Sequence, residues 1–330
     1  MGRKIPLTLI ILLVLLFPIH IGKSSTLILT LTTDNEKYTI GEIITINGTL
    51  TLDGTPVSDA VVTIQINLPN GALWVIRTKQ TGTTTKTWPL EILEAKLCSG
   101  TTVRRGWTAG FNVTIKNNEF VERQFKLMIN AFYSNSIPFA IQSMYEGTIG
   151  SNEIINICVS SVITIPNDAP LGKATAYFNL LTDLPVNGGF AYCPEKALTF
   201  NITGTGSGAQ VPPVEEPEPS NGKCTLKLKT PSIYAFLGNY TVYASTFYYP
   251  HVTSATTQFE VFLRGDLTGP SGLPDGKCDI IDVAFVAVAY GTRPGDPNWN
   301  PQADLNSDGK IDIIDVAIVA YDYGKIGIIG

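Results

Sequence analysis

The sequence predicts a mainly β protein in which two β-sandwich modules are followed by a small α-helical module. Thr, Ile, Val and Gly are abundant, which favours strands and turns over helices. Between residues 26 and 263, polar and apolar residues alternate with period two, as in strands that bury one face. Apolar runs that directly follow acidic loops occur near the C-terminus instead, and 330 residues suffice for two or three domains.

The chain begins with the pattern of a secretory signal peptide. Arg3 and Lys4 precede an apolar stretch at 7–17, and small residues follow at 22–25. This order of charged, hydrophobic and small residues marks exported proteins. A transmembrane anchor is the alternative, but the stretch is shorter than the about 20 residues that a bilayer requires. We therefore expect residues 1–24 to be a signal peptide and the mature protein to be secreted or associated with the cell surface.

The first predicted sandwich begins with residues 26–85. The runs TLILTLTT, EIITINGTLTL and AVVTIQINLP alternate with period two and are separated by turn-forming residues. About four strands are too few for a sandwich of about seven. We expect the three strand-like runs in 223–263 to complete it, because the two halves would then pair each other's open edges. A separate third β unit is the alternative.

Residues 88–203 form the second predicted sandwich, which would then be an insertion in the first. It contains the alternating runs GFNVTIKNN, RQFKLMINAFY, INICVSSVITIP and ATAYFNLLTDLP. The following residues, 204–222, are rich in Gly, Ser, Pro and Glu. Such a composition does not bury a core, so we interpret this segment as a solvated linker.

The most specific motif is DLNSDGKIDIID at 304–315. It fits D-x-[DN]-x-[DN]-G with a carboxylate at position 12, which is the pattern of an EF-hand-like calcium loop. Calcium takes six to eight oxygens, and such a loop wraps them around one ion, with Gly309 allowing the sharp turn. An Asp-Gly turn in a polar loop is the alternative. The predicted ligands are Asp304, Asn306, Asp308, the carbonyl of Lys310, Asp312 and Asp315.

A second copy of this unit lies upstream, because KCDIIDVAFVAVAYG at 277–291 repeats KIDIIDVAIVAYDYG at 310–324. With the same spacing as in the second loop, position 1 of the first loop would be Ser271, which is not an acid. Asp266 occupies position 1 instead if the residues GPSGLP loop out as an insertion. The predicted ligands of this second calcium ion are Asp266, Thr268, Asp275, the carbonyl of Lys277, Asp279 and Asp282. Residues 264–322 hold ten Asp, no Glu and four basic residues, a net charge of −6, whereas the whole chain carries −5.

This duplicated unit, together with the connector RPGDPNWNP, resembles a type I dockerin in its archaeal form, over about 265–325. The resemblance implies two antiparallel loop–helix units that need calcium to fold, and a cohesin-like or other cell-surface protein as the partner. It also implies that the two residues before each position-12 acid recognise the partner. Bacterial members often carry hydroxyl or charged residues there, and a place in the core is the alternative. These residues are Ile280, Ile281, Ile313 and Ile314.

The β segments carry a looser resemblance. KYTIGEIITINGTLTLDGTPVSDAVVTIQI and APLGKATAYFNLLTDLP resemble parts of the immunoglobulin-like modules of archaeal and bacterial cell-surface proteins. The resemblance implies immunoglobulin-like sandwiches that serve display, adhesion or binding.

The five cysteines are an odd number, so at least one is unpaired within the chain. Cys278 occupies position 8 of its loop, where the other copy has Ile311, and we interpret it as a small buried hydrophobe. Of the remaining four, we favour a disulfide between Cys98 and Cys193, with Cys158 and Cys224 either paired or free. Four Asn-x-Thr sequons predict glycosylation in an exported protein: Asn47, Asn112, Asn201 and Asn239.

The sequence favours a non-catalytic protein. His251 is the one histidine outside the predicted leader, neither a phosphate loop nor a nucleophile elbow is present, and the charge gives no support for nucleic-acid binding. An accessory carbohydrate-binding component of extracellular polysaccharide degradation is one alternative; its candidate stacking residues are Phe247, Tyr248, Tyr249, Trp74 and Trp107. A glycoside hydrolase with two carboxylates is the other; its candidates are Glu91, Glu94, Glu119, Glu122, Glu146 and Glu195.

Overall fold

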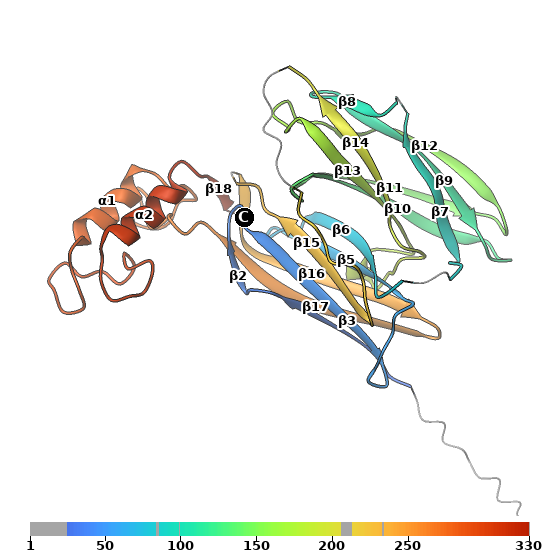
Figure 1. The fold of residues 1–330 in the computed structure, drawn as a ribbon, viewed down its shortest axis with the longest axis horizontal. Coiled ribbons are helices and arrows are strands. Elements are labelled where there is room, and N and C mark those ends of the chain that lie inside the picture. Colours follow the sequence, from blue (N-terminus) through green and yellow to red (C-terminus); the bar gives the residue numbers. More distant parts are fainter. Residues whose placement is uncertain (1–24, 84–85, 99, 206–212, 233, 330) are drawn as a thin grey trace, which may run out of the picture.

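A computed structural model describes residues 25–329 except 84–85, 99, 206–212 and 233. The predicted signal peptide at 1–24 lies outside these residues. The protein is mainly β, as the sequence predicts, with the strands arranged in several sheets (Figure 1). Within the described ranges, no helix is long and apolar enough to cross a membrane.

The first module is built from both ends of the β region. One sheet has the order β1-β3-β15, with β4 beside β3, and the other has the order β2-β17-β16-β5-β6, with β18 beside β16. The first sheet comprises β1 (Leu27–Thr33), β3 (Ile43–Leu52), β4 (Thr55–Pro56) and β15 (Lys223–Lys229). The second comprises β2 (Lys37–Thr39), β5 (Val61–Asn67), β6 (Leu73–Gln80), β16 (Ala235–Tyr248), β17 (His251–Phe262) and β18 (Gly327–Ile329).

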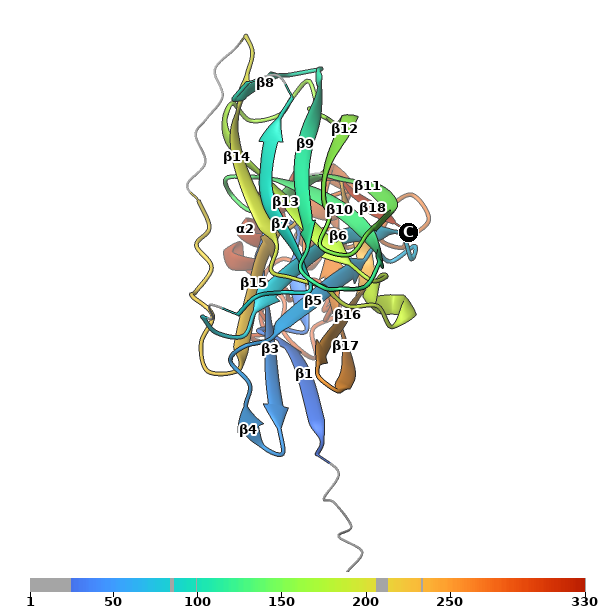
Figure 2. The same ribbon diagram turned by 90° about the vertical axis from the view of Figure 1, so that its right-hand side faces the viewer.

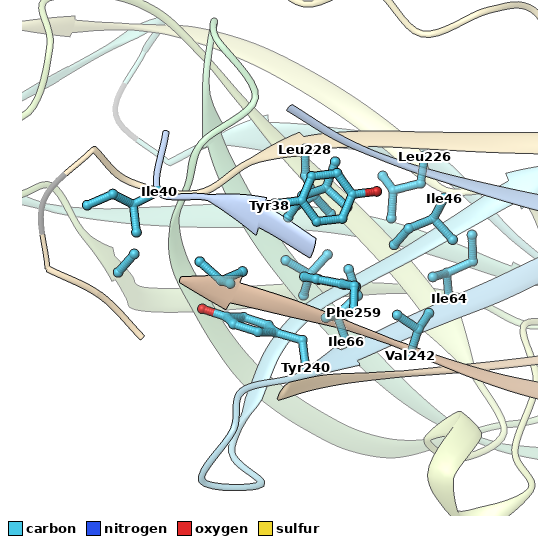
Figure 3. Packing of buried hydrophobic residues seen from close by; sticks show 14 of the residues in the cluster. Tyr38, Ile40, Ile46, Ile64, Ile66, Leu226, Leu228, Tyr240, Val242 and Phe259 are labelled. Atoms are coloured by element: carbon cyan, nitrogen blue, oxygen red, sulfur yellow. The ribbon is translucent and has the colours of Figure 1, made fainter. Parts of the chain in front are cut away.

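Strands from the two chain segments pair in both sheets of this module. β15 runs antiparallel to β3, with Leu226 opposite Ile46, and β16 runs antiparallel to β5, with Val242 opposite Ile66. The core lies between the sheets because alternate residues of each strand point inward. Figure 3 shows Ile46, Leu226 and Val242 there, together with the rings of other buried residues.

The second module is inserted between β6 and β15. Its sheets have the orders β11-β10-β13-β14-β8 and β12-β9-β7. The strands are β7 (Leu90–Leu97), β8 (Thr102–Arg104), β9 (Thr108–Asn117), β10 (Arg123–Tyr133), β11 (Pro138–Ile149), β12 (Ile154–Thr164), β13 (Gly172–Leu181) and β14 (Lys196–Thr203). A 3-10 turn, η1 (Pro185–Asn187), follows β13. Phe111, Phe178 and Phe200 form the centre of a separate core.

The two modules pack against each other through the edge strand β6 (Figure 2). An edge strand leaves backbone groups open, and here the inserted module closes them. The amide of Ile76 donates to Oδ1 of Asn130 at 2.8 Å, and its carbonyl accepts from Nδ2 of Asn179 at 3.3 Å. Next to Ile76, the guanidinium of Arg77 binds Glu195 at 2.7 and 2.8 Å.

The predicted linker is not fully solvated, which corrects its interpretation. Residues 206–212 lie outside the described part, but 213–222 run along the protein surface. The amide of Val214 donates to the carbonyl of Ser134 at 3.3 Å, and a carboxylate oxygen of Glu216 accepts from the amide of Lys227 at 3.1 Å. Glu216 also pairs with Lys79. Its proline-rich composition therefore gives a segment tied to both modules by specific hydrogen bonds.

Two helices follow the first module, α1 (Ile280–Ala289) and α2 (Ile313–Asp322), and they lie together at one end of the molecule (Figure 1). After α2 the chain returns to the first module, where β18 pairs in parallel with Ala235–Leu237 of β16. The amide of Gly327 also donates to the carbonyl of Gly276 at 2.7 Å. The helical segment is therefore fastened to the sandwich at both of its ends.

Candidate metal centre and docking surface

The loop at 304–315 is folded by the carboxylates at its first and last positions. Asp304 accepts hydrogen bonds from the amides of Asp308 (3.1 Å) and Gly309 (2.9 Å), and Gly309 has the positive φ of 79° that favours glycine. Asp315 accepts from the amides of Leu305 and Asp312, both at 2.8 Å. These bonds bring position 12 back beneath the start of the loop.

The same acids begin the helices. The side chain of Asp312 accepts from the amide of Ile314 at 2.9 Å, while Asp315 accepts from the amide of Asp312, which is a reciprocal capping box. Asp279 and Asp282 form the same box at the start of α1. Both helices start with two β-branched isoleucines, which are weak helix formers, so capping matters at these positions.

The first loop repeats this arrangement with Asp266 at position 1. Asp266 accepts from the amides of Asp275 (3.0 Å) and Gly276 (2.7 Å), as Asp304 does from Asp308 and Gly309. Asp282 accepts from the amides of Leu267 and Thr268 at 2.7 and 2.9 Å. Gly276 comes ten residues after Asp266 but Gly309 only five after Asp304, so the additional residues loop out.

The two units are joined by equivalent backbone hydrogen bonds. The amide of Gly291 donates to the carbonyl of Ile311, and the amide of Gly324 donates to the carbonyl of Cys278, both at 2.8 Å. Cys278 and Ile311 are both buried. Burial, together with neighbouring aspartates, raises the pKa of the Cys278 thiol to about 12. The cysteine therefore lies where a small apolar residue belongs.

The electrostatics of the loops favour a cation. Asp282 and Asp315 are completely buried, and burial raises the pKa of Asp266, with further contributions from Asp282 and Asp275. Lys310 reaches 3.7 Å from Asp312 but is exposed and screened by solvent. Among the described residues, no three His, Cys, Asp or Glu side chains converge into a metal-binding group. A backbone carbonyl would complete each donor set, together with the hydroxyl of Thr268 in the first loop and the side-chain amide oxygen of Asn306 in the second, a mixture that suits calcium.

The isoleucines before each position-12 acid are exposed, so they do not belong to the core. Ile280 and Ile313 are 64% and 65% exposed. Other large apolar residues are exposed at matching positions of the two repeats. These eight residues, here named the docking surface, are Ile280, Ile281, Val288, Tyr290, Ile313, Ile314, Tyr321 and Tyr323. Sequence reasoning missed the valine and the tyrosines, although their equivalent places in the two repeats are a readable signal.

Asp322 was also missed. Its buried carboxylate accepts from the amide of Gly265 at 2.9 Å and binds Nζ of Lys325 at 2.6 Å. The repeat has Ala289 at this position, so Asp322 breaks the internal symmetry. Asp322 thus links the end of α2 to Gly265, which lies shortly after the end of β17.

The cysteine prediction needs correction. The structure does not bring Cys98 to Cys193: Cys193 is buried, which raises its pKa to about 12, whereas Cys98 is exposed. Instead, Sγ of Cys98 lies 4.0 Å from Sγ of Cys158. The two cysteines approach each other beside Gly110 of β9, where a Cβ would lie 3.4 Å from Sγ of Cys98. Cys224 is buried in the core of the first module.

The sequon asparagines differ in accessibility. Asn201 and Asn239 are exposed on β14 and β16. Asn47 and Asn112 are half-buried on central strands, and Oδ1 of Asn47 accepts from the hydroxyl of Thr225 at 3.0 Å. Glycosylation stays a prediction at all four.

The candidate sugar-stacking aromatics do not form one platform. Trp74 packs on Tyr240, with ring centroids 5.1 Å apart, beside the core of the first module. Trp107 is exposed immediately before β9. Phe247 and Tyr249 lie together, with centroids 6.4 Å apart.

Several glutamates named as candidate catalytic residues are engaged in ion pairs. Glu195 binds Arg77, Glu119 binds Arg123, and Glu146 binds Lys126.

No family model matches the chain, and no curated protein does either. Similar solved structures include the Pseudomonas fluorescens alkylpurine DNA glycosylase AlkC (8% identity, TM-score 0.28), which aligns over 36% of this chain and 32% of that chain. A β-glucosidase from Listeria innocua (11%, 0.26) aligns over 37% and 17%. A type II cohesin–X–dockerin complex from Acetivibrio cellulolyticus (23%, 0.21) aligns over 32% and 70%. The chain thus spans a third or less of the first two structures. With TM-scores below 0.5, these similarities carry no argument.

Proposed function

We propose that residues 265–325 bind two calcium ions and dock the protein to a cohesin-type or other surface partner, while the two sandwich modules serve display, adhesion or binding. On this proposal the protein is a non-catalytic component of the cell surface or the secreted fraction. The observation that carries it is the repetition of one hydrogen-bonding scheme in two acidic loops, although the first loop holds an insertion.

Each calcium ion would be held by the mixed oxygen set of one loop. In the first loop these are Asp266, Thr268, Asp275, Asp279 and Asp282 with the carbonyl of Lys277; in the second they are Asp304, Asn306, Asp308, Asp312 and Asp315 with the carbonyl of Lys310. A bound cation supplies positive charge among carboxylates that otherwise repel one another. Because Asp282 and Asp315 also cap α1 and α2, relief of this repulsion stabilises the helix starts.

The docking surface supports the second half of the proposal. It presents large apolar side chains at matching positions of both helices, and exposed apolar patches of this kind mark interaction sites. The helices hold these side chains in fixed positions only when the loops are ordered. Partner binding is therefore expected to depend on calcium.

Calorimetry of the chain from residue 25 tests the calcium step. We expect a transition of the helical segment that calcium moves to higher temperature, and a β transition that calcium leaves in place. At calcium concentrations of 100 times Kd, each site adds about 2.7 kcal/mol. Identical scans in calcium and in EGTA would overturn the proposal.

Capture of a partner from the cell-surface fraction tests the docking step. We expect capture in calcium and none in EGTA. The variant carrying Ile280→Asp and Ile313→Asp should lose capture but keep both calcium ions, since neither side chain is a predicted ligand. The matched control carries Val252→Asp and Ile154→Asp, two exposed apolar residues of the sandwich modules, and should capture normally. Capture that is indifferent to the isoleucines would place the partner surface elsewhere.

A further inference from the structure

A cavity of about 460 Å³ lies where the two sandwich modules meet. The first module contributes Phe247 and Tyr249, at the turn between β16 and β17. The second contributes Phe190 and Tyr192, between η1 and β14, and Trp88 enters from the segment before β7. The size is that of a small-molecule site, and such sites often form at domain interfaces.

Aromatic rings form the apolar wall of this cavity. Phe190 stacks on Phe247 with ring centroids 5.0 Å apart and planes inclined by 18°, and Tyr249 meets Phe247 edge-on. Tyr249 is 83% exposed. An exposed ring that lines a cavity can cover a ligand at low entropic cost, because it has only two side-chain torsions.

A second part of the lining, here called the polar wall, is formed by Arg123, Glu119 and Asn118. Nε of Arg123 binds a carboxylate oxygen of Glu119 at 2.5 Å, and Nδ2 of Asn118 donates to the carbonyl of Trp88 at 3.0 Å. Within the part of the chain that the structure describes, the terminal amino groups of Arg123 and the other carboxylate oxygen of Glu119 make no hydrogen bond. The wall therefore offers both donors and an acceptor to a ligand.

The charges on this wall restrict the class of ligand. Arg123 and Glu119 already neutralise each other, and Lys86, near the rings of Trp88 and Tyr248, lies 3.8 Å from Asp59. An anionic ligand would have to displace Glu119, and a cationic ligand would have to displace Arg123. A neutral ligand avoids both costs if its groups both donate and accept hydrogen bonds, as hydroxyl groups do.

We propose that this cavity binds one neutral pyranose unit of a polysaccharide or glycan, with the C–H face of the sugar against the aromatic wall and its hydroxyl groups toward Arg123, Glu119 and Asn118. Both modules contribute to the site, so it exists only while they are held in register by Arg77, Glu195 and the asparagines that bond to Ile76. The site is separate from the calcium loops and acts without them.

Titration with neutral oligosaccharides tests the proposal. The probes are cellopentaose, xylopentaose and mannopentaose, with tetragalacturonic acid as the charged comparison, all in EGTA so that the result is independent of calcium. Tryptophan fluorescence reports binding, because Trp88 lines the cavity. We expect at least one neutral pentasaccharide to bind and to change this signal, and the uronic acid to bind at least tenfold more weakly.

Two variants locate the site. Tyr249→Ala should weaken binding on the order of tenfold, and the exposure of this ring means that the fold does not depend on it. Trp107→Ala, which removes another exposed ring, should leave the affinity unchanged. Arg123→Lys keeps the charge but loses the planar set of donors, and it should weaken binding severalfold.

Three results would overturn the proposal: no binding of any neutral probe at millimolar concentration, equal loss in Tyr249→Ala and Trp107→Ala, or tighter binding of the uronic acid. Loss of calcium binding in the helical segment would leave this test unaffected, so the two proposals fail separately.

Discussion

The interface between the sandwich modules and the C-terminal loops both bury charge, but in opposite ways. At the interface, Arg77 is 2% exposed, forms two hydrogen bonds to Glu195 and lies 3.4 Å from the ring centroid of Tyr177. Burial alone would raise the pKa of Glu195, yet the charges of Arg77 and Lys79 lower it to about 2. In the loops, burial and neighbouring acids act together and raise the pKa of Asp266.

The two regions differ in whether the chain itself supplies the charge that balances the buried groups. The interface carries both signs of charge within the chain, so the two modules form a finished unit. The loops carry an excess of one sign, and their hydrogen bonds arrange carboxylates without neutralising them. The first region is expected to respond to changes in its own residues, and the second to calcium.

Removal of Glu195 should have the largest effect. Glu195→Ala leaves the guanidinium of Arg77 buried without its main partner, and such losses cost about 3–5 kcal/mol. Urea unfolding of the chain from residue 25 measures the change. Glu146→Ala breaks a more exposed pair with Lys126 and should cost less than about 1 kcal/mol. If both substitutions lowered the free energy of unfolding equally, the ion pair between Arg77 and Glu195 would not stabilise the interface in the way described.

Acid should weaken the same interface. The pKa of Glu195 is lowered from 4.5 to about 2, so the unfolded chain binds more protons than the folded protein across this range. The stabilisation is present above about pH 4.5 and is lost as the pH falls toward 2, about 3 kcal/mol in all. Unfolding free energies from pH 6 to pH 2.5 measure it, and Glu195→Ala should flatten the profile. An unchanged profile in the variant would assign the acid sensitivity to other groups.

Asp315→Ala should act through calcium. The substitution removes the proposed closing ligand of the second loop and leaves the amides of Leu305 and Asp312 without their acceptor. Substitution of a residue that only hydrogen-bonds to a metal ligand lowers metal affinity by about 10–100-fold. We expect Asp315→Ala to lower calcium affinity by an amount at the upper end of that range. Calcium titration should then find one site instead of two. Asp296→Ala, which removes an acid of the connector, should keep both sites.

Lys310→Met should have the smallest effect and the opposite sign. The ammonium lies 3.9 Å from Asp308 and 3.7 Å from Asp312, and it offsets part of their charge. Its removal should raise the calcium affinity of the second loop by a factor of about two to five, since exposed pairs are worth about 0.2–1 kcal/mol. The gain should shrink in high salt. Lys196→Met, far along the chain on β14, serves as the control; a weaker calcium affinity in Lys310→Met would contradict the account.

Local patterns predicted much of this architecture. Period-two alternation identified the strands because each buries one face. The spacing of the acids indicated the fold of the second loop, in which Asp304 and Asp315 accept hydrogen bonds from its amides; calcium binding there stays a prediction. The repeat then indicated Asp266, despite the insertion that separates it from Gly276. Contacts between distant residues were not predictable in this way. Arg77 and Glu195 are 118 residues apart, and nothing near either residue specifies the other.

The cavity and the cysteines show the same limit. The aromatic wall takes residues from separate segments of both modules, so no single stretch displays it. Cys98 follows β7 and Cys158 lies on β12, and the two approach each other because both of these strands pair with β9; the order of cysteines along the chain does not contain this pairing.

Titration of the chain from residue 25 with calcium in a calorimeter tests the central claim most directly. The account predicts two bound calcium ions per chain. Asp304→Ala should remove only the second-loop site, and Asp266→Ala only the first. Binding of no calcium, or binding that survives both substitutions together, would contradict the claim that these two loops form the metal centre.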